Sequence, residues 1–252
     1  MMTNTTHSTK IQLPASQHAR IGYHPLKVAT MVLDDMSAYY LPIYNLNTDS
    51  FSHYALLTFI EGLICQGEEE MEQAAKANRD APFASWQQSK AQIFDLLAEE
   101  QITHPRIPKY LDDIEAFFIL IHKLVYQGEI THANIVRAME LAPADFRLLH
   151  TIFCCASGLP VNENLLDLLE PIEVLRDIHW HIANMADDLE HGYFNLYQMF
   201  LQLYGEQTAG QLQAEQKRLE QLLEERLAIS DEQNREAVQP MLTGYRNAEI
   251  SD

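Results

Sequence analysis

One stretch of the chain concentrates side chains that bind metal ions or transfer protons. It spans residues 172–195 and reads IEVLRDIHWHIANMADDLEHGYFN. If this stretch forms an α-helix, which turns by about 100° per residue, its apolar residues form one stripe and its polar residues form a narrow arc beside that stripe. The arc consists of Glu173, Asp177, His181, Asn184, Asp188, His191 and Asn195. It contains none of the lysines and arginines that usually alternate with acids on a solvated helix face, so it is our first candidate for a chemical site.

Three neighbouring residues of this stretch carry oxygen ligands. Asn184, Asp187 and Asp188 offer an amide oxygen and two carboxylates. Mg²⁺ prefers oxygen ligands and commonly bridges protein carboxylates to substrate phosphates. The chain has a formal net charge of −19, so we expect it to handle a diphosphate only with metal ions in between. Such ions neutralise the substrate charge and help a diphosphate leave.

Three segments resemble the class I isoprenoid synthases, which include terpene, prenyl diphosphate, squalene and phytoene synthases. HIANMADDLEHGYFN resembles the second metal-binding region of that family. FRLLHTIFCCASG is similar to the family helix that carries a diphosphate-sensing arginine, which gives Arg147 that role. YHPLKVATMVLDDMSAYYL resembles the opening helix of the bacterial terpene synthases. The resemblance covers mainly residues 143–205.

The resemblance implies an Mg²⁺-dependent enzyme that acts on an isoprenoid diphosphate, or a divergent member that has lost activity. It implies catalytic roles for Asp188, Asp187 and Arg147. The implied metal ligands are Asn184, Asp187, Asp188 and His191, faced by Asp112 and Asp113, and the substrate would contact Arg147 and Lys123. In such an enzyme, Asp188→Ala would abolish Mg²⁺-dependent turnover.

The sequence departs from the family in both acidic motifs. The first should read DDxxD or close to it, and the nearest segments are DDIE at 112–115 and DDMS at 34–37. In the second, His191 and Asn195 replace the usual Ser or Thr and Glu.

Two other interpretations stay open. In one, the arc faces water or a buried hydrogen-bond network, and the protein is a non-catalytic helical protein that binds a ligand or a partner. In the other, the protein is a non-haem di-iron oxidase or oxygenase, and Fe is its cofactor. Asp177 with His181 and Asp188 with His191 would then supply ligands, together with Glu61, His53 or Glu115 from other helices.

The elements that position these residues are predicted to be helices throughout. No alternating run of β-branched residues bounded by turn signals appears, so the fold class is all-α, a single-domain bundle of about nine to ten helices. We expect a mobile arm over residues 1–22, the domain over 23–240 and a tail over 241–252. The predicted helices cover 26–41, 52–78, 85–101, 109–128, 131–141, 144–158, 163–170, 172–195 with its continuation over 193–205, 208–230 and 231–239.

Acidic residues outside the arc receive separate predictions. The run Glu68, Glu69 and Glu70 is predicted to be solvated. Glu61 lies within the apolar half of the same helix and is harder to explain as a surface residue. Asp35 lies on the apolar stripe of the first helix, where a carboxylate needs a partner or a function.

Composition excludes several classes of protein. The net charge of −19 and pI near 4.8 would repel phosphate backbones, so we expect no nucleic-acid partner. No apolar run approaches the roughly 20 residues that cross a bilayer, and the N-terminal residues lack the apolar core of a secretory signal. We therefore expect a cytoplasmic protein. The resemblance implies a small apolar or isoprenoid diphosphate ligand, and a homodimer is compatible with the sequence. The three cysteines, two of them adjacent, imply no disulfide framework.

Overall fold

The computed structural model describes residues 21–46, 53–77, 83–191 and 194–249, and within these ranges the chain forms helices and no strand. The all-α prediction is therefore confirmed. Most of the predicted arm (1–20) lies outside the described residues. The elements are α2 (Tyr23–Tyr39), η1 (Leu41–Tyr44), α3 (Tyr54–Lys76), α4 (Ala84–Glu99), α5 (Arg106–Ile121), η3 (His122–Tyr126), α6 (His132–Leu141), α7 (Ala144–Ala156), α8 (Glu163–Ala183), α9 (Met185–His191), α10 (Leu196–Tyr204), η4 (Gly205–Gln207), α11 (Thr208–Ile229), α12 (Glu232–Ala237) and α13 (Gln239–Glu249).

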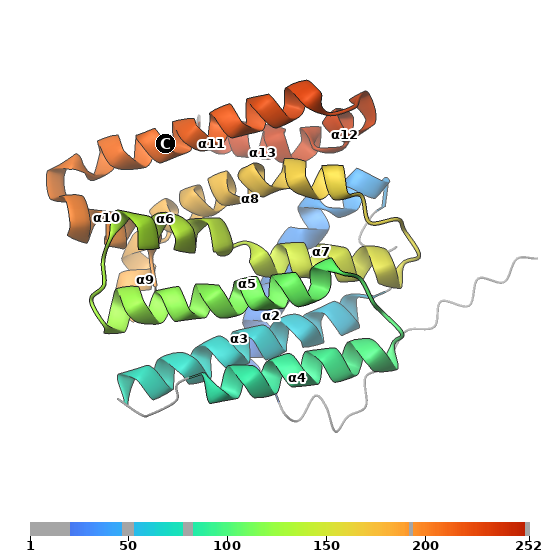
Figure 1. The fold of residues 1–252 in the computed structure, drawn as a ribbon, viewed down its shortest axis with the longest axis horizontal. Coiled ribbons are helices and arrows are strands. Elements are labelled where there is room, and N and C mark those ends of the chain that lie inside the picture. The colour runs from blue at the N-terminus through green and yellow to red at the C-terminus, as the bar shows by residue number, and fades with distance from the viewer. Residues whose placement is uncertain (1–20, 47–52, 78–82, 192–193, 250–252) are drawn as a thin grey trace, which may run out of the picture.

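The helices stack in layers, with α5 and α7 in the middle (Figure 1). On one side lie α3 and α4, which pack against each other, and α2 packs on α3. On the other side lies α8, with α11 and α13 packed along it. None of the described helices has both the length and the apolar content needed to cross a membrane.

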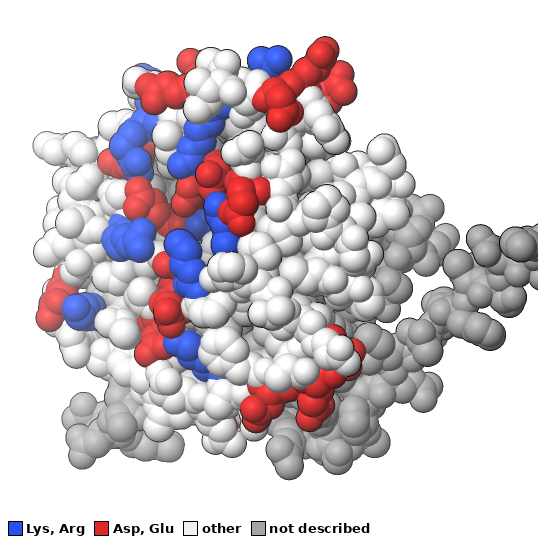
Figure 2. Space-filling view, turned by 45° about the vertical axis from the view of Figure 1, so that its right-hand side comes forward, with Lys and Arg blue, Asp and Glu red and all other residues white. Residues whose placement is uncertain are grey.

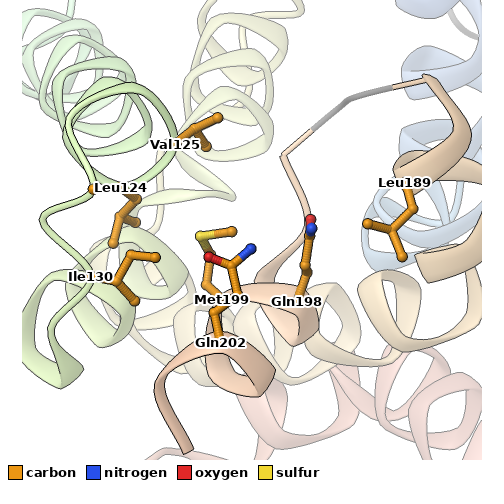
Figure 3. A pocket seen from close by; sticks show the side chains of 8 residues that line it. Leu124, Val125, Ile130, Leu189, Gln198, Met199 and Gln202 are labelled. Atoms are coloured by element: carbon orange, nitrogen blue, oxygen red, sulfur yellow. The ribbon is translucent and has the colours of Figure 1, made fainter. Parts of the chain in front are cut away.

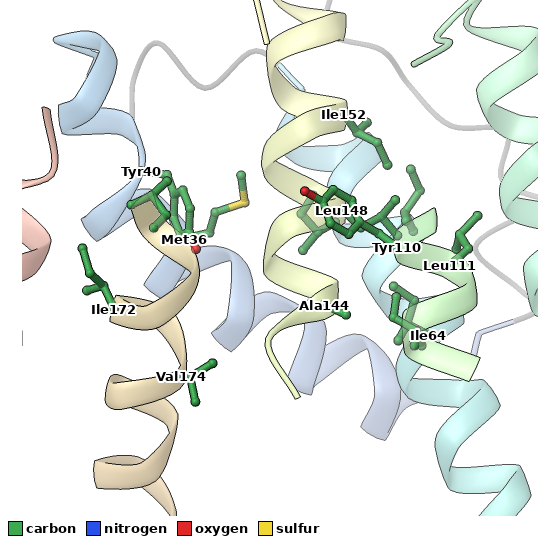
Figure 4. Packing of buried hydrophobic residues seen from close by; sticks show 14 of the residues in the cluster. Met36, Tyr40, Ile64, Tyr110, Leu111, Ala144, Leu148, Ile152, Ile172 and Val174 are labelled. Carbon is green, nitrogen blue, oxygen red and sulfur yellow. The ribbon is translucent and has the colours of Figure 1, made fainter. Parts of the chain in front are cut away.

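One continuous hydrophobic core joins these layers. Figure 4 shows side chains of α2, α3, α5, α7 and α8 converging on it. The large side chains of Met36 in α2 and of Tyr40, which directly follows α2, have no exposed surface. Leu148 and Ile152, one helical turn apart on α7, are equally buried. Because every layer contributes to the same core, the described chain is one domain.

The helix that carries the polar arc differs from the prediction at both ends. Instead of starting at Pro171, α8 begins at Glu163, where the Asn162 side chain accepts a hydrogen bond from the Leu165 N–H (3.1 Å). Pro171 lies inside α8 and is buried. The helix then ends at Ala183 rather than continuing to Asn195. The arc is therefore split: three of its members lie on α8, and the others lie beyond its end.

The C-terminal segment also differs from the prediction. Residues 241–249, expected to form a tail, belong to α13. Met241, Leu242 and Tyr245 are buried, and α13 packs against α8. These apolar side chains, four or fewer positions apart, give the helix one face for the core.

The predicted helix over 109–128 contains a change of geometry. Regular α5 ends at Ile121, and His122–Tyr126 forms the π-helical turn η3. Gly128 follows with a φ of +68°, a left-handed conformation that glycine adopts without steric cost. The helical segment therefore ends just before Gly128, the last residue of the predicted range 109–128. Single π-helical turns inside helices are frequent at functional sites.

Surface ion pairs join the helices that are distant in sequence. Figure 2 shows basic and acidic side chains alternating in bands on one face. Arg106 of α5 pairs with Asp167 of α8 (3.1 Å), and Arg226 of α11 pairs with Glu170 of α8 (2.9 Å). Exposed pairs of this kind typically contribute less than about 1 kcal/mol each, so the core carries most of the stability.

Candidate functional site

Acidic side chains line one face of α3. Glu61, Cys65, Glu68 and Glu72 follow each other at helical spacing and form a stripe. Glu61 is 2% exposed; its Oε1 accepts a hydrogen bond from Cys65 Sγ (3.4 Å), and its Oε2 has no partner. Glu68 is half-buried, so the prediction that it is solvated was wrong, whereas Glu70 is exposed as expected. The spacing of the stripe was the signal that would have separated Glu68 from its neighbours.

Two carboxylates on other helices belong to the same electrostatic group: Asp145 acts on Glu61 and Glu68, and Asp177 acts on Asp145. Asp145 lies in the first turn of α7, where its Oδ1 accepts a hydrogen bond from the Phe146 N–H (2.7 Å). The negative charge of Asp145 raises the pKa of both Glu61 and Glu68. Asp177 of α8, whose side chain is 25% exposed, in turn raises the pKa of Asp145. We call Glu61, Glu68, Asp145 and Asp177 the carboxylate cluster.

Burial holds protons on all four members of the carboxylate cluster, and repulsion adds to it at Glu61, Glu68 and Asp145, whereas Arg176 and Arg147 lower the pKa of Asp177. Burial is the largest cause for each member: it raises the pKa of Asp145 and Asp177 to about 7 and that of Glu68 to about 8. Burial also raises the pKa of Glu61 well above its ordinary value. The cluster therefore needs either protons or a bound cation near neutral pH.

His181 lies beside the cluster, one turn after Asp177 on α8. It is 6% exposed, its Nε2 is 3.5 Å from Asp177 Oδ2, and its Nδ1 has no partner. Burial lowers its pKa to about 4, so the ring is neutral at pH 7. The imidazole packs edge-on against Phe194 (5.7 Å between ring centroids), which packs edge-on against Phe117 (6.0 Å). A neutral imidazole and an aromatic wall thus border the carboxylates.

A short hydrogen-bonded chain connects His181 to the segment after α8. Asn195, which caps α10, donates from Nδ2 to the His181 carbonyl (2.7 Å) and to Asp188 Oδ2 (2.8 Å). Asp188 is 4% exposed and its charge acts on the His181 ring. The structure therefore brings Asp188, His181 and Asn195 of the predicted arc together.

The other members of the predicted metal region are placed differently. Asn184 ends α8, and its Nδ2 donates to the Trp180 carbonyl (2.8 Å). Asp187 is exposed on α9. His191 is the last residue of α9, and its side chain lies outside the described residues.

Arg147 is held by protein groups. Its Nε donates to Glu173 Oε2 (2.8 Å), and its Nη1 donates to the Glu140 carbonyl (3.3 Å). The Tyr40 hydroxyl donates to the other Glu173 oxygen (2.5 Å). All three side chains of this Tyr40–Glu173–Arg147 network are buried. A diphosphate-sensing role for Arg147 would require the network to open.

The residues predicted to face the arc are engaged on other surfaces. Asp112 pairs with Lys90 of α4 (2.7 Å) and has a 71% exposed side chain, and Asp113 pairs with Lys109 (2.5 Å). Lys123 is half-buried in η3. The acidic side chains whose charges act between layers come instead from α3 and α7.

Three other predicted acids and bases have structural partners or positions. Asp35 pairs with Arg176 of α8 (3.1 Å), but its side chain is 52% exposed, so the prediction that it lies on the apolar face of its helix was wrong. Glu115 pairs with Lys90 (2.7 Å), and His53 precedes the first turn of α3. None of these contacts places the three residues in the carboxylate cluster.

The pKa shifts predict how stability depends on pH in chelator-treated protein. From about pH 6.5 to 8.5, unfolded carboxyls are ionised, whereas folded Asp145, Asp177 and Glu68 still release protons. The folded state then binds more protons than the unfolded state, so stability falls as pH rises. Buried His150 and His181, whose pKa values are lowered to about 3 and 4, act in the opposite direction only below about pH 6.5.

We expect the Tm to fall across this window by at least about 2–4 °C, the shift for roughly 1 kcal/mol in a chain of this size. Differential scanning calorimetry measures it. The double variant Asp145→Asn, Asp177→Asn should flatten the curve. An unchanged slope in that variant would show that these carboxyls are not the cause.

Across the part of the chain that the structure describes, no three His, Cys, Asp or Glu side chains lie in an arrangement that would already hold a metal ion. Cys65, Cys154 and Cys155 are all free thiols. Comparison with known proteins gives no match: no family model, no curated protein and no solved structure matches this chain.

Proposed function

We propose that this protein binds Mg²⁺ at the carboxylate cluster and uses it to hold the diphosphate of an isoprenoid diphosphate. One observation carries the proposal: the charge of Asp145 on α7 raises the pKa of Glu61 and Glu68 on α3, and the charge of Asp177 on α8 raises the pKa of Asp145. A bound cation would relieve that repulsion. The proposal agrees with the resemblance to class I isoprenoid synthases, but takes the facing acidic wall from α3 and α7 rather than from α5.

The chemistry of the cluster suits Mg²⁺. Glu61 Oε2 and Asp177 Oδ2 have no hydrogen-bond partner, so both oxygens are free to coordinate a cation. Mg²⁺ usually keeps several waters and is held by one or two carboxylates together with substrate phosphates. A complete set of protein ligands is therefore not required before substrate binds.

The aromatic side chains beside the cluster suit the hydrocarbon part of such a substrate. Phe117 and Phe194 are half-buried and meet edge to face next to His181. Their apolar surface would pack against an isoprenoid chain while the carboxylates hold the cations. When bound, the ions neutralise the diphosphate and make it a better leaving group.

A non-haem iron enzyme is the second candidate, and His181 favours it. Imidazole nitrogen is a common ligand of iron and a poor one for Mg²⁺. His181 is neutral, buried and close to Asp177, with Nδ1 unpartnered. Iron would then be bound at the part of the carboxylate cluster where Asp177 lies beside His181.

Isothermal titration calorimetry tests the proposal. Chelator-treated protein is titrated with farnesyl diphosphate, with and without Mg²⁺, and with farnesol as a control that lacks the diphosphate. We expect saturable binding of farnesyl diphosphate that requires Mg²⁺. Binding of equal strength without the cation would overturn the proposal and favour a non-catalytic binding protein.

Metal analysis separates the two candidates. Protein purified without chelator is expected to contain no stoichiometric iron. One or two iron ions per chain, together with no Mg²⁺-dependent diphosphate binding, would favour the iron enzyme instead.

A further inference from the structure

A cavity lies between η3, α9 and α10, apart from the carboxylate cluster. Its volume is about 280 Å³. Figure 3 shows Leu124, Val125 and Ile130 on one side and Leu189 on the other, with the side chains of α10 between them. The described residues that line it are Leu124, Val125, Gly128, Ile130, Leu189, Gln198, Met199 and Gln202. It shares no residue with the carboxylate cluster.

Apolar side chains are exposed at this cavity. Leu189 is 44% exposed and Val125 is 38% exposed, although both are aliphatic. Leu124 and Val125 belong to the π-helical turn η3, whose altered geometry is itself typical of functional sites. The space beside Gly128 is open, since a Cβ there would meet no atom within 4 Å.

The polar part of the lining is uncharged. Gln198 and Gln202 of α10 each offer an amide donor and an amide acceptor. Among the described residues that line the cavity there is no Lys, Arg or His to compensate an anionic head group, in a chain of net charge −19. A hydroxyl head, which both donates and accepts hydrogen bonds, suits the two amides.

We propose that this cavity binds a small neutral molecule with an aliphatic body and a hydroxyl head. At roughly 30 Å³ for each water-sized group, the volume corresponds to about nine heavy atoms. This ligand class differs from the charged diphosphate of the carboxylate cluster. Its binding requires no cation, so it stands or falls independently of the proposed function.

The probe is 1-octanol, and octanoate of the same chain length is the charged control. Calorimetric titration of the full chain in the presence of chelator should show saturable binding of 1-octanol at one site. Octanoate should bind at least about tenfold more weakly, a difference of ~1.4 kcal/mol. Equal binding of the two probes, or no binding of 1-octanol, would overturn the proposal.

A matched pair of variants locates the site. Leu189→Gln replaces an aliphatic side chain of the cavity lining with a polar one and should weaken 1-octanol binding roughly five- to tenfold. Leu201→Gln is the control, because Leu201 is 45% exposed on α10 but does not line the cavity. Equal effects of both variants would contradict the assignment. A dimer in solution that Leu189→Gln alone dissociates would show that a second copy of the chain covers this face, and would also overturn it.

Discussion

Replacing Arg147 with methionine is expected to lower the free energy of unfolding by about 3–5 kcal/mol. The guanidinium and the Glu173 carboxylate are both buried and are joined by a 2.8 Å hydrogen bond. Removing the arginine leaves Glu173 with the Tyr40 hydroxyl as its remaining side-chain donor. Burial already raises the pKa of Glu173, and loss of the positive charge would raise it further. Urea unfolding followed by circular dichroism measures the change.

The control and the rescue separate this buried pair from a surface ion pair. Arg218, whose side chain is 43% exposed, pairs with Glu140 and Glu215, so Arg218→Met should cost no more than about 1 kcal/mol. Adding Glu173→Met to Arg147→Met removes the stranded charge and should restore more than half of the lost stability. Equal costs for Arg147→Met and Arg218→Met would show that the buried network does not stabilise the fold.

Neutralising the carboxylate cluster is expected to separate stability from ligand binding. Asp145→Asn and Glu68→Gln each remove a charge that repels buried neighbours, so both variants should be more stable than the wild type at pH 8. Both should also weaken Mg²⁺-dependent binding of farnesyl diphosphate at least about tenfold, which corresponds to ~1.4 kcal/mol. Stability gained at the expense of binding is characteristic of a functional site.

Exposed acids of the same types serve as controls. Glu70 lies on α3 only two positions after Glu68 but is exposed, and Asp112 lies on α5 with a 71% exposed side chain, so Glu70→Gln and Asp112→Asn are the control variants. Neither should change diphosphate binding. If Asp112→Asn weakens binding as much as Asp145→Asn does, the facing wall is α5, as the sequence motif indicated, and the cluster is not the metal site.

Local patterns in the sequence predicted the helices but not how they meet. The apolar and polar faces of the stretch from Ile172 follow from residue spacing alone. Spacing did not reveal that α8 continues through Pro171, because tertiary packing of a long helix can outweigh the loss of one backbone donor. Nor did it reveal the break after Ala183, where no glycine or proline marks the end of the helix.

The candidate site depended on contacts between distant segments. The resemblance singled out Arg147, but its partner Glu173 lies 26 positions later on another helix. Glu61 was noticed as a carboxylate in an apolar segment, and it belongs to the cluster. Asp145 was missed, because an acid in the first turn of a helix is commonly explained by the helix dipole. A single sequence does not specify which helix faces α8.

The most direct test is a crystal structure with Mn²⁺ and pyrophosphate, in which anomalous scattering locates the metal. We expect an Mn²⁺ peak within ligand distance of carboxylate oxygens from Asp177 and from at least one of Glu61, Glu68 and Asp145, with pyrophosphate bound to the ion. A peak held by Asp112 and Asp113, or no ordered Mn²⁺ at saturating concentration, would contradict the proposal that the carboxylate cluster is a divalent cation site.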